Sequence, residues 1–271
     1  MGMTSRIFLA ATALIALTGA AAPTAPRRIV SLNVCADQYL LALADPAQIA
    51  ALSSNARDPE LSATASRARG FRTLRRPAEE VLAIRPDLIL GFPIGPNAVA
   101  GAPPGQWRTL GLASADSYGA ILDQIRQVAR ATGHVDRGEA LIAAMNRDLA
   151  ALPRPRRGGV AAYYQRRGYM TGTGTLIDDL MRRVGLTNLA AKLGKPPLAQ
   201  VPLEEMVAAR PDWLIVESAT DRVVDQGTEM LHHPALAAVP RISLPQSWTV
   251  CGGPAYVQAA RTIMARLNAP R

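Results

Sequence analysis

Two segments far apart in the chain carry nearly the same sequence, and this internal repeat restricts the fold more than any other feature. Residues 77–90 read PAEEVLAIRPDLIL and residues 202–215 read PLEEMVAARPDWLI, with identity at Pro, Glu, Glu, Ala, Arg, Pro and Asp. A leading proline suits the first turn of a helix, the two glutamates favour its positive end, and the second proline stops it before a strand. The repeat therefore predicts two lobes that share a helix, a turn and a strand.

The apolar residues of the repeat indicate which side of each helix faces the core. Three in each copy fall at the i, i+3 and i+4 spacing of one helix face. They are Ala78, Val81 and Leu82 in the first copy and Leu203, Met206 and Val207 in the second. We expect this face to be buried, so that Glu79 and Glu204 point into solvent.

Short β-type runs alternate with amphipathic stretches along the rest of the chain. The runs cover residues 28–32, 87–92, 160–164, 212–217 and 241–244. This alternation is typical of parallel sheets covered by helices. The sequence thus predicts an α/β fold with two Rossmann-like lobes, at residues 23–134 and 154–271.

A helical stretch at residues 135–153 lies between the two lobes, and prolines at positions 153 and 155 stop it. A helix of about 16 residues is about 24 Å long, which is enough to join two lobes. We expect one long interdomain helix, stiffer than a Gly/Ser linker, and therefore little lobe closure.

The first residues are typical of an export signal. Arg6 precedes an apolar run at residues 7–17 and a small-residue stretch at 18–22. About eleven apolar residues are too few to span a bilayer, which needs about 20. We expect residues 1–22 to be a signal peptide cleaved after Ala20 or Ala22, with no lipid anchor because no cysteine is near, and a protein free in the periplasm.

The formal net charge of +9 comes almost entirely from arginine. A high positive charge can indicate a protein that binds nucleic acid. The arginines are scattered, however, aromatic residues make up only 4% of the chain, and an exported protein rarely meets nucleic acid. We therefore expect no nucleic-acid partner and consider a positive field that attracts an anionic ligand the better interpretation.

The chain has two cysteines, Cys35 and Cys251, near its opposite ends. An oxidising periplasm permits a disulfide if their Cα atoms lie within about 7 Å. The alternative is that both are small buried apolar residues. The sequence leaves this choice open.

Ligands of open α/β sheets bind beyond the carboxyl ends of the strands. Four loops have that position, at residues 33–37, 92–97, 163–173 and 247–253. Aromatic and polar side chains in them suit a bulky organic or chelate ligand. The candidate contacts are Asn33, Cys35, Phe92, Tyr163 or Tyr164, Arg166 with Arg167 for an anionic group, and Trp248. The alternative for the two adjacent tyrosines is that they are alternating strand residues, one of them in the core, because neighbouring strand residues face opposite ways.

Metal and catalytic motifs are weak. His232 and His233 are adjacent and His134 stands alone, whereas helical metal ligands need a spacing of three or four residues. The stretch TGTGT at 171–175 lacks the lysine of a phosphate loop, and no GxSxG, HExxH or CxxC occurs. We expect no resident metal, no cofactor and no enzymatic activity.

Taken in order, several motifs resemble the helical-backbone (class III) periplasmic binding proteins of ABC importers, the cobalamin- and ferric-siderophore-binding group. They are RIVSLN, PAEEVLAIRPDLILGF, HVDRGEALIAAMNRDLAAL, TGTGTLIDDLMRRVGL, PLEEMVAARPDWLIV, HPAL and LPQSW. Each is loose alone, but their order and spacing cover essentially the whole chain after residue 22.

The resemblance implies a partner and a docking mode. In that family an acidic residue on each lobe docks into an arginine pocket of the permease dimer, seven residues before the proline of a Pro-Asp pair. The matching residues here are Glu79 and Glu204. A monomer that delivers a cobalamin-type corrinoid or an iron chelate, such as a siderophore or haem, is implied.

Cobalamin itself is less well supported, since cobalamin binders often have tryptophans where this chain has Thr73 and Leu198. Two other classes stay open. A metal-ion receptor of the same fold would need converging His and carboxylate ligands, and an exported α/β enzyme would need strongly perturbed groups in the cleft.

Overall fold

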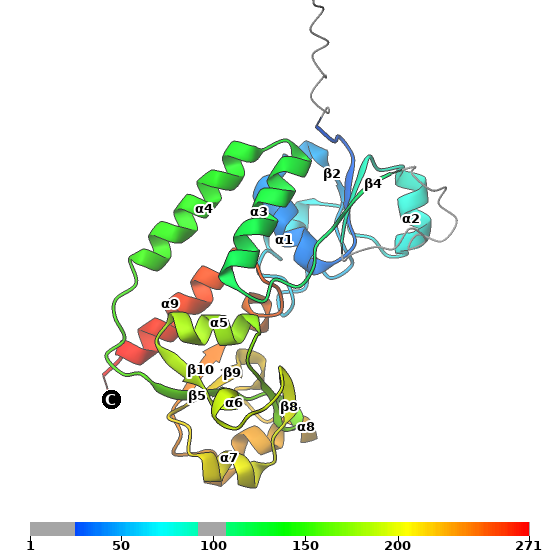
Figure 1. The fold of residues 1–271 in the computed structure, drawn as a ribbon. Helices are drawn as coiled ribbons and strands as arrows, with labels where there is room; N and C mark the ends of the chain where they lie inside the picture. Colours follow the sequence, from blue (N-terminus) through cyan, green and yellow to red (C-terminus); the bar gives the residue numbers. More distant parts are fainter. Residues whose placement is uncertain (1–24, 92–106, 271) are drawn as a thin grey trace, which may run out of the picture.

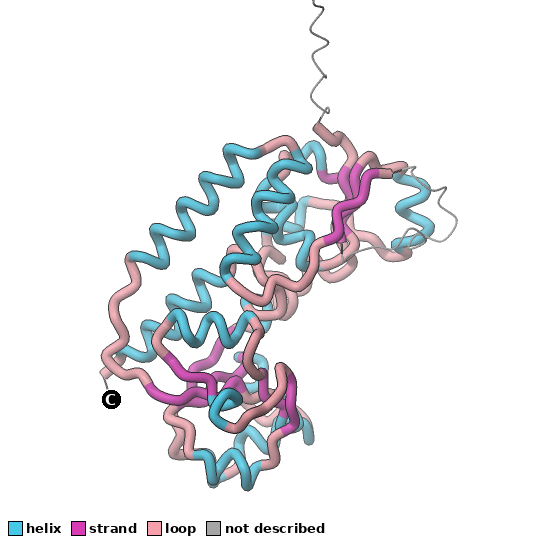
Figure 2. The backbone as a smooth tube through the Cα atoms, in the orientation of Figure 1, coloured by secondary structure: helices cyan, strands magenta, loops and turns pink. Residues whose placement is uncertain are grey.

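The computed structural model describes residues 25–91 and 107–270. It has two lobes, each built on a parallel sheet with helices packed against it, as Figure 1 shows. The strands form two separate groups, one in each lobe (Figure 2). The α/β class and the paired parallel sheets are thus confirmed. The predicted signal peptide at 1–22 and Phe92 lie outside the described residues.

The N-terminal lobe contains a four-stranded sheet in the order β2-β1-β3-β4. Its strands are β1 (Ile29–Ser31), β2 (Ile49–Ala51), β3 (Leu88–Gly91) and β4 (Arg108–Gly111). The helices of this lobe are α1 (Val34–Leu43), α2 (Pro77–Ile84) and α3 (Tyr118–Thr132). All of the strand pairs are parallel, so the carboxyl ends of all four strands lie at one edge.

The C-terminal lobe contains a second parallel sheet in the order β10-β9-β5-β7. Its strands are β5 (Gly159–Tyr163), β7 (Leu186–Asn188), β9 (Trp213–Glu217) and β10 (Arg241–Leu244). A small antiparallel pair consists of β6 (Tyr169–Thr171) and β8 (Leu198–Gln200). The helices are α5 (Leu176–Arg183), α6 (Leu189–Lys192), α7 (Leu203–Ala209), α8 (Gln226–Glu229) and α9 (Tyr256–Asn268). None of the helices in the described ranges combines the length and the apolar content that crossing a bilayer requires.

Helix α4 (Val135–Ala150) lies between the two lobes in the chain and has 16 residues. It packs against α3 and α9 and descends from the N-terminal lobe toward the C-terminal one (Figure 1). The loop after β10 also reaches the N-terminal lobe, because the Tyr39 hydroxyl of α1 donates to the carbonyl of Gly252 at 2.7 Å. That residues 135–153 form the sole bridge between the lobes therefore remains a prediction.

One cluster of buried apolar side chains runs through both lobes. It includes Ile29 and Ile125 of the N-terminal lobe together with Leu180, Ile215 and Ile263 of the C-terminal lobe. A shared core leaves less freedom for relative motion than a solvated linker. This continuity supports a stiff frame with small lobe closure.

A polar cluster joins α3, α5 and α9 beside this core. The carboxylate of Asp179 accepts hydrogen bonds from the Tyr256 hydroxyl at 2.6 Å and from the backbone N–H of Tyr118 at 3.2 Å. The Arg183 guanidinium lies 4.5 Å from the centre of the Tyr118 ring. Burial, followed by the hydrogen bond and charge of Asp179, raises the pKa of Tyr256, so its hydroxyl stays a donor.

We expect Tyr256→Phe to lower the free energy of unfolding by about 1.5–3 kcal/mol, because the substitution removes a hydrogen bond to a charged group. Urea denaturation followed by circular dichroism measures the change. Tyr169→Phe is the matched control, since that ring is 40% exposed. Equal denaturation midpoints for the two variants would show that this hydrogen bond does not stabilise the protein.

The repeated helices α2 and α7 end in the same unusual way. Arg85 and Arg210, each followed by a proline, adopt left-handed backbone conformations with φ of 50° and 46°. Val81 and Met206 are buried as expected. The expected burial of Leu82 and Val207 is wrong, because they are 38% and 36% exposed. These helices have only 8 and 7 residues, and each buries a narrower stripe than the spacing suggested, which leaves Ala78 exposed as well.

The left-handed arginines give a stability prediction. A side chain in this conformation brings its Cβ close to the carbonyl oxygen, which glycine avoids. We expect Arg210→Gly to raise the free energy of unfolding by about 0.5–1 kcal/mol and Arg210→Val to lower it by a similar amount. Equilibrium denaturation checks both, and the opposite order would contradict the backbone assignment.

Candidate ligand-binding site

A pocket of about 360 Å³ lies between the two lobes. Its walls come from loops at the carboxyl ends of β1 and β4 in the first sheet and of β5, β9 and β10 in the second. Both sheets therefore direct the ends where ligands usually bind toward the same space. Ligand pockets in proteins measure about 300–1,000 Å³, and this one is near the lower limit. A bulky ligand would therefore insert one end into the pocket and extend outward.

The wall from the N-terminal lobe is built by the start of α1, the loop after β4 and helix α3. Asn33 caps α1, with its side-chain oxygen accepting from the Ala36 N–H at 2.9 Å. Gln124 of α3 donates from Nε2 to the carbonyl of Ala113 at 2.5 Å, which holds the loop after β4 in place. These bonds fix polar side chains at the pocket edge before any ligand arrives.

The wall from the C-terminal lobe contains a chain of hydrogen-bonded polar groups. Nε2 of Gln165 donates to the Glu217 carboxylate at 3.3 Å, and the Thr171 hydroxyl donates to Oε1 of Gln165 at 3.4 Å. The Tyr163 hydroxyl lies 3.2 Å from the Thr249 hydroxyl. Burial and then the negative charge of Glu217 raise the pKa of Tyr163, so this phenol is protonated at neutral pH.

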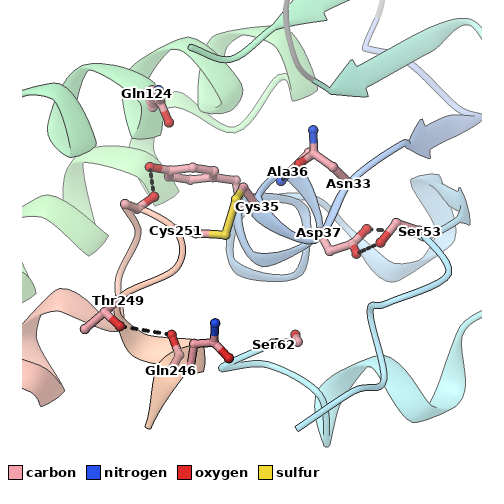
Figure 3. The surroundings of a disulfide bond; sticks show 12 residues. Asn33, Cys35, Ala36, Asp37, Ser53, Ser62, Gln124, Gln246, Thr249 and Cys251 are labelled. Carbon is pink, nitrogen blue, oxygen red and sulfur yellow. Dashed lines mark hydrogen bonds between the residues drawn. A yellow bond between two sulfur atoms is a disulfide. The ribbon is translucent and has the colours of Figure 1, made fainter. Parts of the chain in front are cut away.

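A disulfide joins the two walls. Cys35, in the first turn of α1, is bonded to Cys251 in the loop after β10, with a Cα–Cα distance of 5.4 Å. Figure 3 shows the bond between Asn33 on one side and the segment with Gln246 and Thr249 on the other. Gly252 follows at a close contact, since a Cβ there would lie 2.4 Å from that of Ala115. The choice that the sequence left open is thus resolved in favour of a bond.

The structure brings some of the predicted contact residues together and separates others. Asn33, Cys35 and Tyr163 line the pocket. Tyr164 does not, because it faces the opposite side of its sheet, is fully buried and donates to the Val201 carbonyl at 2.9 Å. Arg166 forms an ion pair with Asp225 and is not among the lining residues.

Trp248 packs partly buried against the main core and does not line the pocket either. Conversely, the sequence interpretation missed Glu217 and the loop at 112–116, which do line it. Glu217 is the last residue of a strand that the sequence predicted, so a carboxylate at a strand's carboxyl end was the available signal. The loop at 112–116 was missed because β4 was not recognised.

Glu79 and Glu204, the proposed outward glutamates of the repeat, are both exposed. Each lies on a helix, α2 or α7, at the far end of its lobe from α4 (Figure 1). The Glu79 side chain is 69% exposed and pairs with Arg76. Its neighbour Glu80 instead accepts from the backbone N–H groups of Arg75 and Arg76, and these bonds, with Arg72, lower its pKa to about 2.

The second copy shows the same division of roles. Glu205, next to Glu204, pairs with Lys195 at 2.7 Å, whereas Glu204 makes no ion pair with the described residues. In each copy the second glutamate is held by contacts within its lobe, and the first is exposed to solvent. The outward placement argued from the repeat thus agrees with the positions of both side chains.

No group of three or more His, Cys, Asp or Glu side chains suited to a metal ion occurs in the described part of the chain. His134 lies near Gln48 and Asp45 at the edge of the N-terminal lobe, and His232 lies near the Thr220 carbonyl. These two histidines therefore have their hydrogen-bond partners in different lobes.

A second hollow, of about 530 Å³, lies on the N-terminal lobe between α1 and α4. Its charged lining groups already have partners within the protein. Arg137 pairs with Asp45 at 2.8 Å, and Arg67 donates to the Leu41 carbonyl. The pocket between the lobes is lined by loops at the carboxyl ends of both sheets and is the better candidate.

A family model described as "Periplasmic binding protein" matches residues 29–241. Among solved structures, a periplasmic haem-binding protein of Roseiflexus is 26% identical, with a TM-score of 0.68, 89% of this chain covered and 97% of that one. The periplasmic haem-binding protein of Vibrio cholerae is 21% identical, with a TM-score of 0.70 and coverage of 89% and 99%. The periplasmic vitamin B12-binding protein of Vibrio cholerae is 16% identical, with a TM-score of 0.63 and coverage of 89% and 96%. The search of curated proteins finds no match.

Proposed function

The chain belongs to the periplasmic binding protein family, and we propose that it captures a cobalamin-type corrinoid or an iron chelate and delivers it to an ABC permease. Siderophore and haem chelates both fall within this proposal. The observation that carries it is the pocket between two lobes, at the carboxyl ends of both parallel sheets. The named ligands of the relatives, haem and vitamin B12, support the ligand class.

Docking to the permease dimer is assigned to Glu79 and Glu204. Both are exposed, both occupy the same position in a repeated helix, and the neighbouring glutamates are used within their lobes. A monomer with one acidic group on each lobe fits a dimeric partner that offers two basic pockets. Exposed carboxylates of this kind speed and orient association with a basic surface.

Export to the periplasm follows from the family, and the predicted signal peptide at 1–22 would direct it. The disulfide between Cys35 and Cys251 fits an oxidising compartment. In this role the protein binds and releases its ligand without chemistry, and ATP hydrolysis takes place in other subunits.

A metal-ion receptor of the same fold is the second candidate, and it is less well supported because the described residues bring no three metal-ligating side chains together. An exported enzyme is the third. The raised pKa of Tyr163 keeps this pocket phenol protonated, so it does not supply a base at neutral pH.

The proposal is tested by purifying the protein from the periplasm of its own cells and recording native mass spectra and absorption spectra. We expect a retained mass and a visible absorption band of a corrinoid, a ferric chelate or haem. Protein stripped of ligand is then titrated with each class. A bound bare metal ion, or substrate turnover by the stripped protein, would favour the second or the third candidate instead.

A further inference from the structure

The pocket between the lobes has a charge opposite to that of the whole protein. The chain has a formal net charge of +9. The described residues that line the pocket include two carboxylates, those of Asp116 and Glu217, and no Lys, Arg or His. In this basic protein, the charged side chains among the described lining residues are thus all acidic.

Glu217 is the more informative of the two, because it is only 8% exposed. No Lys, Arg or His of the described residues forms an ion pair with it. A buried carboxylate without a cation is costly unless hydrogen bonds satisfy it. Nε2 of Gln165 supplies one such bond, at 3.3 Å, and the Tyr163 hydroxyl, whose pKa Glu217 helps to raise, lies near enough to offer a second. An ionised carboxylate can accept about four, so capacity is left for a ligand.

The surrounding residues hold this carboxylate in place. It ends β9 in the centre of the sheet, next to β5, which carries Tyr163. The Thr171 hydroxyl orients Gln165 from the other side. The acceptor therefore sits on rigid strands at a fixed point of the pocket, as a recognition group requires.

Neither Arg166 nor Arg167 lines the pocket. Arg166, the candidate contact for an anionic ligand, is paired with Asp225 outside the lining. An anionic ligand group placed beside Glu217 would meet like charge, with no cation among the described lining residues to offset it.

We propose that Glu217 receives a ligand group that is neutral or cationic and donates hydrogen bonds. This inference rests on the proposed function and narrows its ligand class. A corrinoid fringed with carboxamides, or a hydroxamate chelate that carries an ammonium group, meets the requirement. Haem, with two propionates, and anionic catecholate chelates do not.

The test titrates ligand-free protein with three probes and measures dissociation constants by tryptophan fluorescence and calorimetry. The probes are dicyanocobinamide, which is rich in amides, ferrioxamine B, which carries an ammonium group, and haemin, which carries two carboxylates. We expect the wild-type protein to bind one of the first two at least about tenfold more tightly than haemin, since one charged hydrogen bond corresponds to a factor of about 10–100.

The matched variants are Glu217→Gln and Glu229→Gln, which remove the same charge inside and outside the pocket. We expect Glu217→Gln to weaken the preferred probe by about 10- to 100-fold and to leave haemin equal or tighter. Glu229→Gln should change neither. Thermal denaturation of both variants verifies that they fold.

The outcomes separate the two proposals. Preferential binding of haemin by the wild type, or equal binding of the preferred probe by wild type and Glu217→Gln, overturns the role of Glu217 and leaves the receptor function intact. This wild-type comparison needs no variant, so a folding defect cannot obscure it. Failure to bind any of the three probes overturns the chelate-receptor function and this inference with it.

Discussion

Reversing the charge of Glu79 and Glu204 together, to arginine, should abolish uptake of the ligand while leaving its affinity for the isolated protein unchanged. Both side chains are exposed on helices remote from the pocket, and neither lines it. The change therefore alters the surface offered to the permease without altering the cleft. Each reversal replaces an attraction toward a basic pocket with repulsion, and juxtaposed like charges cost several kcal/mol.

The measurement is accumulation of labelled ligand by cells that express the permease and the variant, together with the dissociation constant of the purified variant. Single reversals should give intermediate uptake, because each removes one of the two proposed contacts and leaves the other in place. Leu82 and Val207 lie three positions after Glu79 and Glu204 and are likewise exposed. Each lobe thus presents an acidic and an apolar side chain together on one repeated helix.

The control is the double variant Glu60→Arg/Glu229→Arg, which makes the same change of charge at exposed sites, one in each lobe. It should transport normally. Glu80 and Glu205 are unsuitable controls, because Glu80 accepts from the backbone N–H groups just before α2 and Glu205 pairs with Lys195. Normal uptake by the Glu79/Glu204 variant, or equal loss in the control, would remove the docking role.

Much of the fold was predictable because its signals are local. The repeated segment gave α2 with β3 and α7 with β9, since proline stops a helix and apolar runs favour strands wherever they occur. The strand β10 matches the predicted residues 241–244. By contrast β2, β4 and β7, each at the edge of its sheet, and the small pair β6 and β8 were missed. These segments have three or four residues and become strands only by pairing with a neighbour.

The candidate site was predictable only in outline. The rule that ligands bind beyond strand ends located three of the loops that line the pocket. It did not decide between Tyr163 and Tyr164, because adjacent strand residues face opposite sides and only the packed sheet shows which side is the cleft. Arg166 was expected to meet the ligand, but it pairs with Asp225, which is far away in the chain. Such pairing depends on tertiary structure that no local pattern records.

Removing the disulfide, by Cys35→Ser with Cys251→Ser, should lower the free energy of unfolding by about 3–5 kcal/mol. The bond closes a loop with a sequence separation of 216 residues, and cross-linking so long a loop restricts the unfolded chain strongly. Contacts around it persist without it, including the bond from the Tyr39 hydroxyl to Gly252 and the packing of Gly252 on Ala115. We therefore expect the variant to fold, with a lower urea midpoint.

The same variant should bind ligand more weakly, because both cysteines line the pocket and the bond fixes the loop that carries Gln246 and Thr249 (Figure 3). Restricting a loop before binding lowers the entropy that binding must remove, so its release costs affinity. Urea denaturation with and without dithiothreitol checks the stability effect, and the reductant should act on the wild type alone. If the reduced wild type and the double variant both kept the midpoint and the affinity of the oxidised protein, the bond would have neither role.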